Sequence, residues 1–282
     1  MIMKEYCFKK NLLRFFLFSV FSVLSVNKTI AQGDLVVFPK RLVFEERNRT
    51  QQINLANIGK DSAVYNISFV EFRMNESGGF EEITAPDLGQ QFASPFLRLY
   101  PRQVTLAPNE SQTVKVQVIN TSKLQAGEYR SHLYFRAIKS SKPLGQEKTE
   151  VDPAALSVKI EAVFGVSIAS IIRKGESDTS VTLSGLEYIE TAESGSVLNF
   201  DINRKGNMST YGDITVSYNS PKNIVYEVGK INGIGVYTPG TLRKNQMRLQ
   251  KPEGVNFAGG KFKVVYTENE SKEIIAEKEL NL

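Results

Sequence analysis

The stretch that decides the fold is Leu156-Ser157-Val158-Lys159-Ile160-Glu161-Ala162-Val163-Phe164-Gly165-Val166-Ser167-Ile168. Apolar side chains occupy every even-numbered position, and Val163 is the one large apolar residue at an odd-numbered position. Side chains of a β-strand point alternately to its two faces, so one face of this strand is wholly apolar. At about 3.3 Å per residue the segment extends over roughly 40 Å, longer than a typical strand. Such a strand either lies deep in a β-sandwich or lends its apolar face to a partner.

The first 32 residues have the pattern of an export signal. An apolar stretch, Phe15–Val26, follows a basic beginning, and Ala31 offers a small residue for cleavage. The stretch is too short for a membrane span, which needs about 20 residues. We therefore predict a signal peptide over residues 1–32, with an uncleaved anchor as the alternative. Cys7 precedes the apolar stretch and is badly placed for lipid attachment.

The charge of the chain is concentrated in this predicted signal. The whole chain has 35 Lys and Arg against 30 Asp and Glu, a net charge of +5. Removing residues 1–32 takes away five bases and one acid, which leaves 30 against 29. The mature chain is therefore nearly neutral and gives no reason to expect nucleic acid or an anionic membrane as a partner. It also lacks cysteine, so it must rest on its hydrophobic core rather than on disulfides.

Short alternating runs separated by turn residues continue through the whole mature chain, and no window has sustained helical spacing. We predict an all-β fold of two immunoglobulin-like β-sandwich domains in tandem, residues 33–170 and 171–282. Asn232-Gly233 lies between two alternating runs and predicts a two-residue hairpin turn. The polar segment Ile138–Pro153 has little to bury and predicts a mobile loop directly before the long alternating strand.

Residues that carry catalytic or metal chemistry are scarce. His132 is the one histidine, and its place in a predicted strand favours a packed or surface side chain over a catalyst. No His or Cys pair has metal-ligand spacing, so we expect neither a metal nor a cofactor. Gly233-Ile234-Gly235 has no helix after it, which argues against a phosphate-binding loop. The sequence therefore predicts a protein that is not an enzyme.

Several segments of the first domain resemble the PapD-like periplasmic chaperones of pilus assembly, in particular a divergent branch known only as molecular chaperones. The segments that carry the resemblance are Pro39–Phe44, Gln52–Gly59, Leu99–Pro108, Gly127–Arg136 and Phe164–Ile168. The resemblance implies a boomerang-like pair of domains, a periplasmic location and a monomeric protein when free. Its partner would be a pilin-like or other β-rich secreted subunit, and an outer-membrane usher is a further candidate.

The resemblance also implies a mechanism. In the family, the long alternating strand of the chaperone completes a subunit that lacks its last strand, by strand addition. Such pairing covers an edge that would otherwise aggregate. The residues that would enter the client are those nearest the polar loop, namely Leu156, Val158, Ile160 and Ala162. Phe164, Val166 and Ile168 would instead pack in the protein's own core. The alternative is that the whole apolar face is ordinary core.

In the family, an arginine and a lysine hold the terminal carboxylate of the client. Arg41 matches the arginine, and a guanidinium can bind a carboxylate through two parallel hydrogen bonds. The expected lysine position is occupied by Phe164, if Ala169 takes the place of the proline that usually ends the strand. Lys159, five residues earlier, is a weak substitute, and Arg130 and Arg136 are alternative cations. This departure puts the carboxylate anchor in question.

Two functions from different classes remain. The first is a chaperone that caps strand-deficient fimbrial or other secreted β-rich subunits. The second is a structural component of a cell-surface or fibre assembly, in which the same strand would be exchanged between neighbouring copies.

Overall fold

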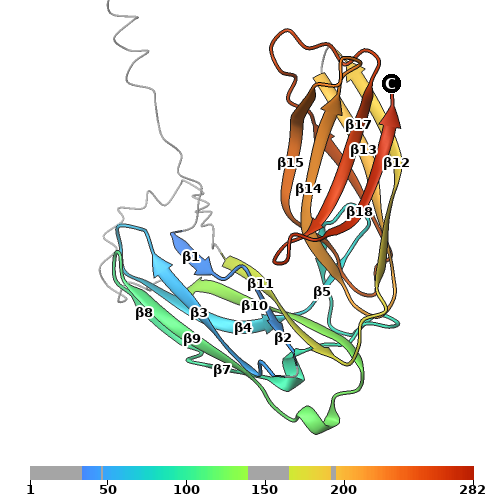
Figure 1. Cartoon of the computed structure of the whole chain (residues 1–282). Helices are drawn as coiled ribbons and strands as arrows, with labels where there is room; N and C mark the ends of the chain where they lie inside the picture. Colours follow the sequence, from blue (N-terminus) through green and yellow to red (C-terminus); the bar gives the residue numbers. More distant parts are fainter. Residues whose placement is uncertain (1–33, 46, 139–164, 192–194) are drawn as a thin grey trace, which may run out of the picture. The chain divides into compact units, whose positions relative to one another are not determined.

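The computed structural model describes residues 34–45, 47–138, 165–191 and 195–282 (Figure 1). Leu35–Leu282 forms one compact unit. Strands dominate these ranges, and their only helical segments are two short 3-10 turns, η1 (Ser94–Phe96) and η2 (Thr121–Lys123). Within the described ranges, neither turn has the length or apolar character of a membrane-crossing helix. The predicted class, two β-sandwiches in tandem, is confirmed.

The first sandwich consists of two sheets that enclose one core. One sheet has the strand order β1 (Leu35–Phe38), β3 (Thr50–Asn57), β9 (Ser111–Val118), β7 (Leu97–Tyr100). The other has the order β2 (Arg41–Phe44), β11 (Gly165–Lys174), β10 (Gly127–Ile138), β4 (Ala63–Val70), β8 (Gln103–Leu106). Alternate residues of these strands are buried, as period-two patterning requires. The most deeply buried include Ile53, Leu55, Val114, Val116, Leu133 and Phe135.

The second sandwich has its own core between a three-stranded and a four-stranded sheet. The first sheet has the order β12 (Ser180–Thr191), β13 (Gly195–Lys205), β16 (Leu242–Arg248). The second has the order β15 (Val225–Val236), β14 (Thr210–Asn219), β17 (Lys261–Glu268), β18 (Ile274–Asn281). Aromatic side chains fill much of the core, where Tyr218, Phe257 and Phe262 have ring centroids 4.9 to 5.5 Å apart.

The hairpin turn predicted at Asn232-Gly233 is wrong. β15 runs through both residues as one strand and pairs with β14 on both sides of them. The register shifts between Gly212 and Ile214, and Gly233 has a φ of +70°, so the two residues form a β-bulge. The local turn chemistry is the same in a bulge and a hairpin, and the continuous ladder with β14 decides between them.

A small hairpin from the first sandwich reaches the second. It consists of β5 (Phe72–Met74) and β6 (Phe80–Glu82), joined by the predicted turn at residues 75–79. Met74 is buried in the core of the second sandwich. At the turn, the backbone N–H of Lys244 donates to the carbonyl of Glu76 at 2.7 Å. Sequence patterning missed β6, because all three of its side chains are exposed and give no alternation.

β11 contributes side chains to both cores. Ile168 and Ile172 pack in the first core, whereas Ala169 and Ile171, of the other parity, pack in the second. The domain boundary that we predicted at residue 170 therefore lies inside a strand. We propose that the change of domain follows Lys174, where β11 ends.

Candidate functional site

The long alternating strand is described only in its last part. Leu156, Val158, Ile160 and Ala162, the predicted client-pairing residues, lie outside the described residues, as do Lys159 and Phe164. The described part begins at Gly165 and continues as β11. Val166 and Ile168 pack against the first core, as predicted for this end of the strand.

The first half of β11 has a free edge. β10 pairs with β11 along one side, from Gly165 to Lys174. On the other side, β2 pairs in parallel only with residues from Ala169 to Ile172. Within the described ranges, no strand occupies the edge of Gly165–Ile168 on that side. This segment therefore presents backbone N–H and C=O groups to a further strand.

Arg41 stands where the free edge meets the paired part of β11. It is the first residue of β2 and lies opposite Ala169 in the ladder. Its guanidinium carbon lies 4.5 Å from the ring centroid of Tyr211, in β14 of the second sandwich. Nε and Nη2 are buried and have no hydrogen-bond partner. Leaving such a donor unpaired costs about 1–3 kcal/mol, and more when it is charged.

A cavity of about 690 Å³ lies beside Arg41, between the two sandwiches. Phe38, Lys40 and Arg41 line it from the first sandwich, and Tyr211 and Glu268 are among the residues that line it from the second. An anion entering this cavity would meet the guanidinium of Arg41.

Glu268 is the nearest candidate to neutralise Arg41, but its carboxylate is used elsewhere. Its Oε2 accepts the backbone N–H groups of Glu270 at 2.7 Å and Ser271 at 2.6 Å. Burial raises the pKa of Glu268, but these two hydrogen bonds, with a smaller contribution from the charge of Arg41, outweigh it and lower the pKa overall. Glu268 is thus ionised and held by its own turn, and Arg41 has no ion pair with any described residue.

The two alternative cations have different environments. Arg130 is almost fully buried and donates through Nη2 to the carbonyls of Phe72 and Thr238, at 3.2 and 3.3 Å. Its guanidinium lies 4.8 Å from the ring centroid of Tyr237, and burial lowers its pKa. Arg130 therefore belongs to the junction of the two sandwiches. Arg136 is exposed and lies opposite Gly165, at the beginning of the free edge.

His132 is packed, which is one of the two environments, packed or surface, that the sequence predicted. Its ring meets Phe72 and Phe80 edge-on, with centroids 5.0 and 5.3 Å apart. Burial, with a further contribution from the charge of Arg130, lowers the pKa of His132 to about 3. The imidazole is therefore neutral at physiological pH and has no access to solvent for proton transfer.

A buried carboxylate fixes the second sandwich against the first. Glu128 is buried in β10 and accepts a hydrogen bond from Arg173 Nε at 3.1 Å. It also accepts the backbone N–H of Ser209 at 3.0 Å, the Ser209 hydroxyl, and the Thr238 hydroxyl at 3.2 Å. Ser209 lies two residues before Tyr211, so this network helps to set the position of Tyr211 relative to Arg41.

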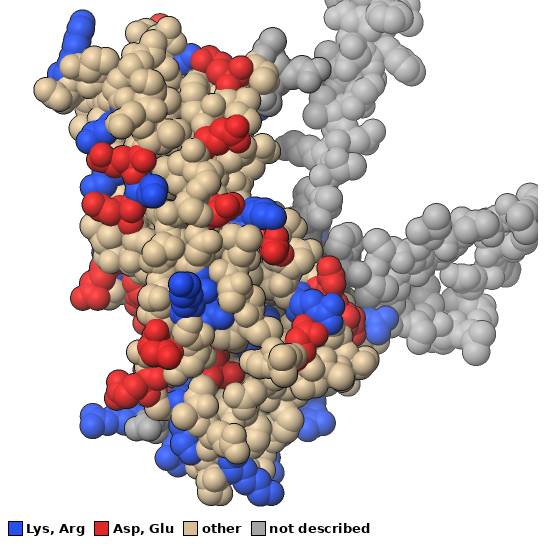
Figure 2. All heavy atoms as spheres, turned by 90° about the vertical axis from the view of Figure 1, so that its right-hand side faces the viewer, with Lys and Arg blue, Asp and Glu red and all other residues tan. Residues whose placement is uncertain are grey.

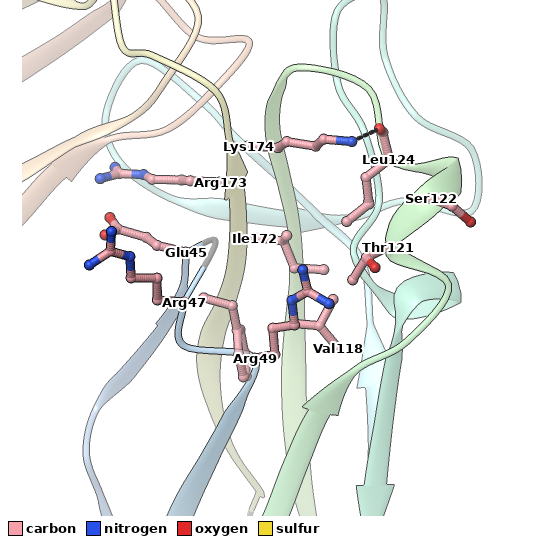
Figure 3. A pocket seen from close by; sticks show the side chains of 11 residues that line it. Glu45, Arg47, Arg49, Val118, Thr121, Ser122, Leu124, Ile172, Arg173 and Lys174 are labelled. Carbon is pink, nitrogen blue, oxygen red and sulfur yellow. Dashed lines mark hydrogen bonds between the residues drawn. The ribbon is translucent and has the colours of Figure 1, made fainter.

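A second hollow, of about 430 Å³, lies at the far end of β11 (Figure 3). Several cations line it, and two of them, Arg173 and Lys174, are already bound to other groups of the protein. Lys174 Nζ donates to the carbonyl of Leu124 at 2.5 Å, whereas Arg173 extends away from Leu124 (Figure 3). Arg173 is bound to Glu128 and to the carbonyl of Ser209. We therefore assign the candidate site to Arg41 and the free edge.

The charged surface gives no other candidate on the face shown in Figure 2. Basic and acidic side chains are interspersed over it, without one continuous patch of either sign. Among the described residues, no three metal-ligating side chains are grouped to hold an ion.

Comparison with known proteins gives similarity at the level of solved structures. No family model and no curated protein matches the chain. One similar structure is a chaperone–tip adhesin complex of CFA/I fimbriae biogenesis, 12% identical, covering 88% of this chain and 98% of that chain, with a TM-score of 0.45. Another is the CsuC–CsuE chaperone–tip subunit complex of Acinetobacter baumannii Csu pili, which is 10% identical and covers 88% of this chain and 97% of that chain, with a TM-score of 0.42. A third is the periplasmic chaperone SfaE, which is 10% identical and covers 88% of this chain and 98% of that chain, with a TM-score of 0.40.

Proposed function

We propose that the mature chain is a periplasmic chaperone that binds and caps strand-deficient fimbrial or other secreted β-rich subunits. One observation carries this proposal. The alternating apolar segment enters β11 where the strand has a free edge, directly beside the unpaired guanidinium of Arg41.

Strand addition at this edge would give the complex its affinity. A client strand would pair with the backbone of Gly165–Ile168 and of the preceding residues, on the side that β2 leaves open. Leu156, Val158, Ile160 and Ala162 would fill the gap in the client's core. Each fully buried Leu, Val or Ile side chain stabilises by roughly 1.5–3 kcal/mol, so a few insertions are enough for a firm complex.

Arg41 would fix the register of the client strand. Arg41 lies at the end of the free edge. A client strand that pairs with this edge and runs parallel to β11 would therefore end beside a cation. A terminal carboxylate there would satisfy Nε and Nη2 together, in the two-bond geometry that guanidinium and carboxylate favour. Lys159 remains a proposed second cation.

Tagged mature protein, recovered from its native envelope fraction and analysed by mass spectrometry, tests the proposal. We expect a one-to-one complex with a β-rich secreted protein. Ile160→Glu should abolish recovery, because it would bury a charge in the client, whereas Ser157→Glu on the opposite parity should not. Arg41→Met should reduce recovery, and Arg98→Met, an exposed arginine on β7, is its matched control.

Other outcomes decide against the proposal. Equal recovery with Ile160→Glu and Ser157→Glu would reject strand donation. Concentration-dependent polymers in sedimentation experiments, without a smaller bound protein, would favour the structural alternative, in which copies of the chain exchange strands.

A further inference from the structure

The two glycines around Ile234 make room for one aromatic ring. Gly235 pairs with Tyr211 across the β14–β15 ladder. A Cβ atom at Gly235 would lie 3.2 Å from Cδ2 of Tyr211, and one at Gly233 would lie 2.5 Å from its hydroxyl. Any larger residue would therefore push the ring away. The Gly-Ile-Gly sequence leaves the space that the ring of Tyr211 occupies.

The guanidinium of Arg41 lies against the same ring. The guanidinium lies 4.5 Å from the ring centroid, within the range in which a cation is attracted to an aromatic face. An aromatic face attracts the charge of a guanidinium without requiring any of its N–H groups as hydrogen-bond donors. Tyr211 can therefore hold Arg41 while Nε and Nη2 remain without a hydrogen-bond partner.

No other described residue restrains the guanidinium by a hydrogen bond or an ion pair. Lys40, the neighbouring cation, is exposed, and Glu268 is bound to its own turn. A free arginine side chain has many rotamers, and fixing them on binding reduces affinity. A ring that fixes them beforehand removes that loss.

We propose that Tyr211 is a positioning residue that holds the guanidinium of Arg41 ready for a carboxylate, so that the second sandwich completes an anion site whose cation belongs to the first. The proposal rests on the carboxylate anchor in the proposed function. It gives the second sandwich a part in client capture that neither the free edge nor the donor strand provides.

Side-chain NMR of the full mature protein tests this proposal. The Arg41 Nε–Hε signal, assigned with Arg41→Lys, reports the order of the guanidinium through its heteronuclear NOE. N-acetylvaline is the carboxylate probe, and N-acetylvalinamide is the uncharged control. We expect an ordered guanidinium in the wild type and in Tyr211→Phe, but a mobile one in Tyr211→Leu. The affinity for N-acetylvaline should fall about tenfold in Tyr211→Leu and less than twofold in Tyr211→Phe.

Two outcomes would overturn the proposal. If Tyr211→Leu keeps both the order and the affinity, Tyr211 does not position Arg41. Equal binding of the acid and the amide by the wild type would remove the carboxylate anchor and this inference with it. A failure of the proposed chaperone function would give a different result. Ile160→Glu and Ser157→Glu would then recover the client equally from the envelope fraction, although N-acetylvaline still binds. Thermal unfolding of Tyr211→Leu shows whether the fold has survived.

Discussion

Arg41 and Arg130 make similar contacts with tyrosines of the second sandwich, but they differ in their burial and in their hydrogen-bond partners. Their guanidinium carbons lie 4.5 and 4.8 Å from the ring centroids of Tyr211 and Tyr237. Arg130 lies in the interior with two carbonyl partners, whereas Arg41 has none and borders a cavity. Arg130 also keeps Nε and Nη1 unpaired, so unpaired donors alone do not mark a binding site. The cavity and the free edge make the difference: one arginine joins the sandwiches, and the other is available to a ligand.

The largest expected effect comes from removing the carboxylate beside Arg130. Glu128→Ala should lower the free energy of unfolding by about 3–5 kcal/mol, because it leaves the buried Ser209 N–H and Thr238 hydroxyl without their acceptor and breaks the ion pair with the partly exposed Arg173. Chemical denaturation measures this loss, and Glu187→Ala, an exposed carboxylate of β12, is the control. If both variants lose the same small amount, the network does not hold the junction together.

Replacing the two arginines in turn tests the comparison directly. Arg130→Met should lower the free energy of unfolding by about 2–3 kcal/mol, since it removes two hydrogen bonds from the interior and takes away the side-chain partner of the Thr238 carbonyl, whereas the Phe72 carbonyl keeps Gln90 as a donor. Arg41→Met should change it by less than about 1 kcal/mol, because no protein hydrogen bond is lost. Denaturation of the two variants side by side gives the answer. Equal losses would mean that Arg41 is also structural.

The buried His132 should make the stability of the protein depend on pH. Between pH 7 and 5 the unfolded chain protonates His132, whose ordinary pKa is 6.5, whereas the folded chain, with a pKa of about 3, does not. Stability is thus fully present above pH 6.5 and falls as the pH falls, by about 2 kcal/mol at pH 5. Denaturation of the wild type and His132→Gln at both values measures this difference, which the variant should lack.

A second buried group, Glu71, also contributes to the pH dependence of stability. Burial raises the pKa of Glu71 above 4.5, against hydrogen bonds from Ser94 and Ser131 and the charge of Arg130. A raised carboxyl pKa stabilises the folded state as the pH falls, opposite to the effect of His132. Glu71 is present in both the wild type and His132→Gln, so the difference between their pH dependences reports His132. The same pH dependence in the wild type and in His132→Gln would contradict the buried, neutral imidazole.

Much of the fold could be predicted because burial leaves a period-two pattern in each strand. The alternating runs at residues 35–38, 112–118 and 261–267 predict strands that match β1, β9 and β17 within a residue or two, and the run at 51–56 lies within β3. β8 and β6 were missed, and β15 was divided in two, because short or exposed strands and bulges give weak local signals. Arg41 came from a resemblance of sequence; the structure places it beside a cavity, and its role as a carboxylate anchor stays a prediction.

Tyr211 could not have been found in this way. In the sequence it lies just before a predicted strand of the second domain, and nothing near it points to Arg41, 170 positions away. The glycines that receive its ring resembled a nucleotide-binding pattern and a hairpin turn. Only the β14–β15 ladder shows that they lie beneath one side chain.

The sequence alone determined that this protein is an all-β chain with two cores, because alternation and turn residues act over a few neighbouring positions. The long amphipathic strand that it also predicts lies mostly outside the described residues. The tertiary structure decided which arginine is free, which is committed to the junction, and what holds the free one in place. These depend on contacts between residues far apart in the chain, such as Arg41 with Tyr211 and Glu128 with Ser209, and no local pattern records them.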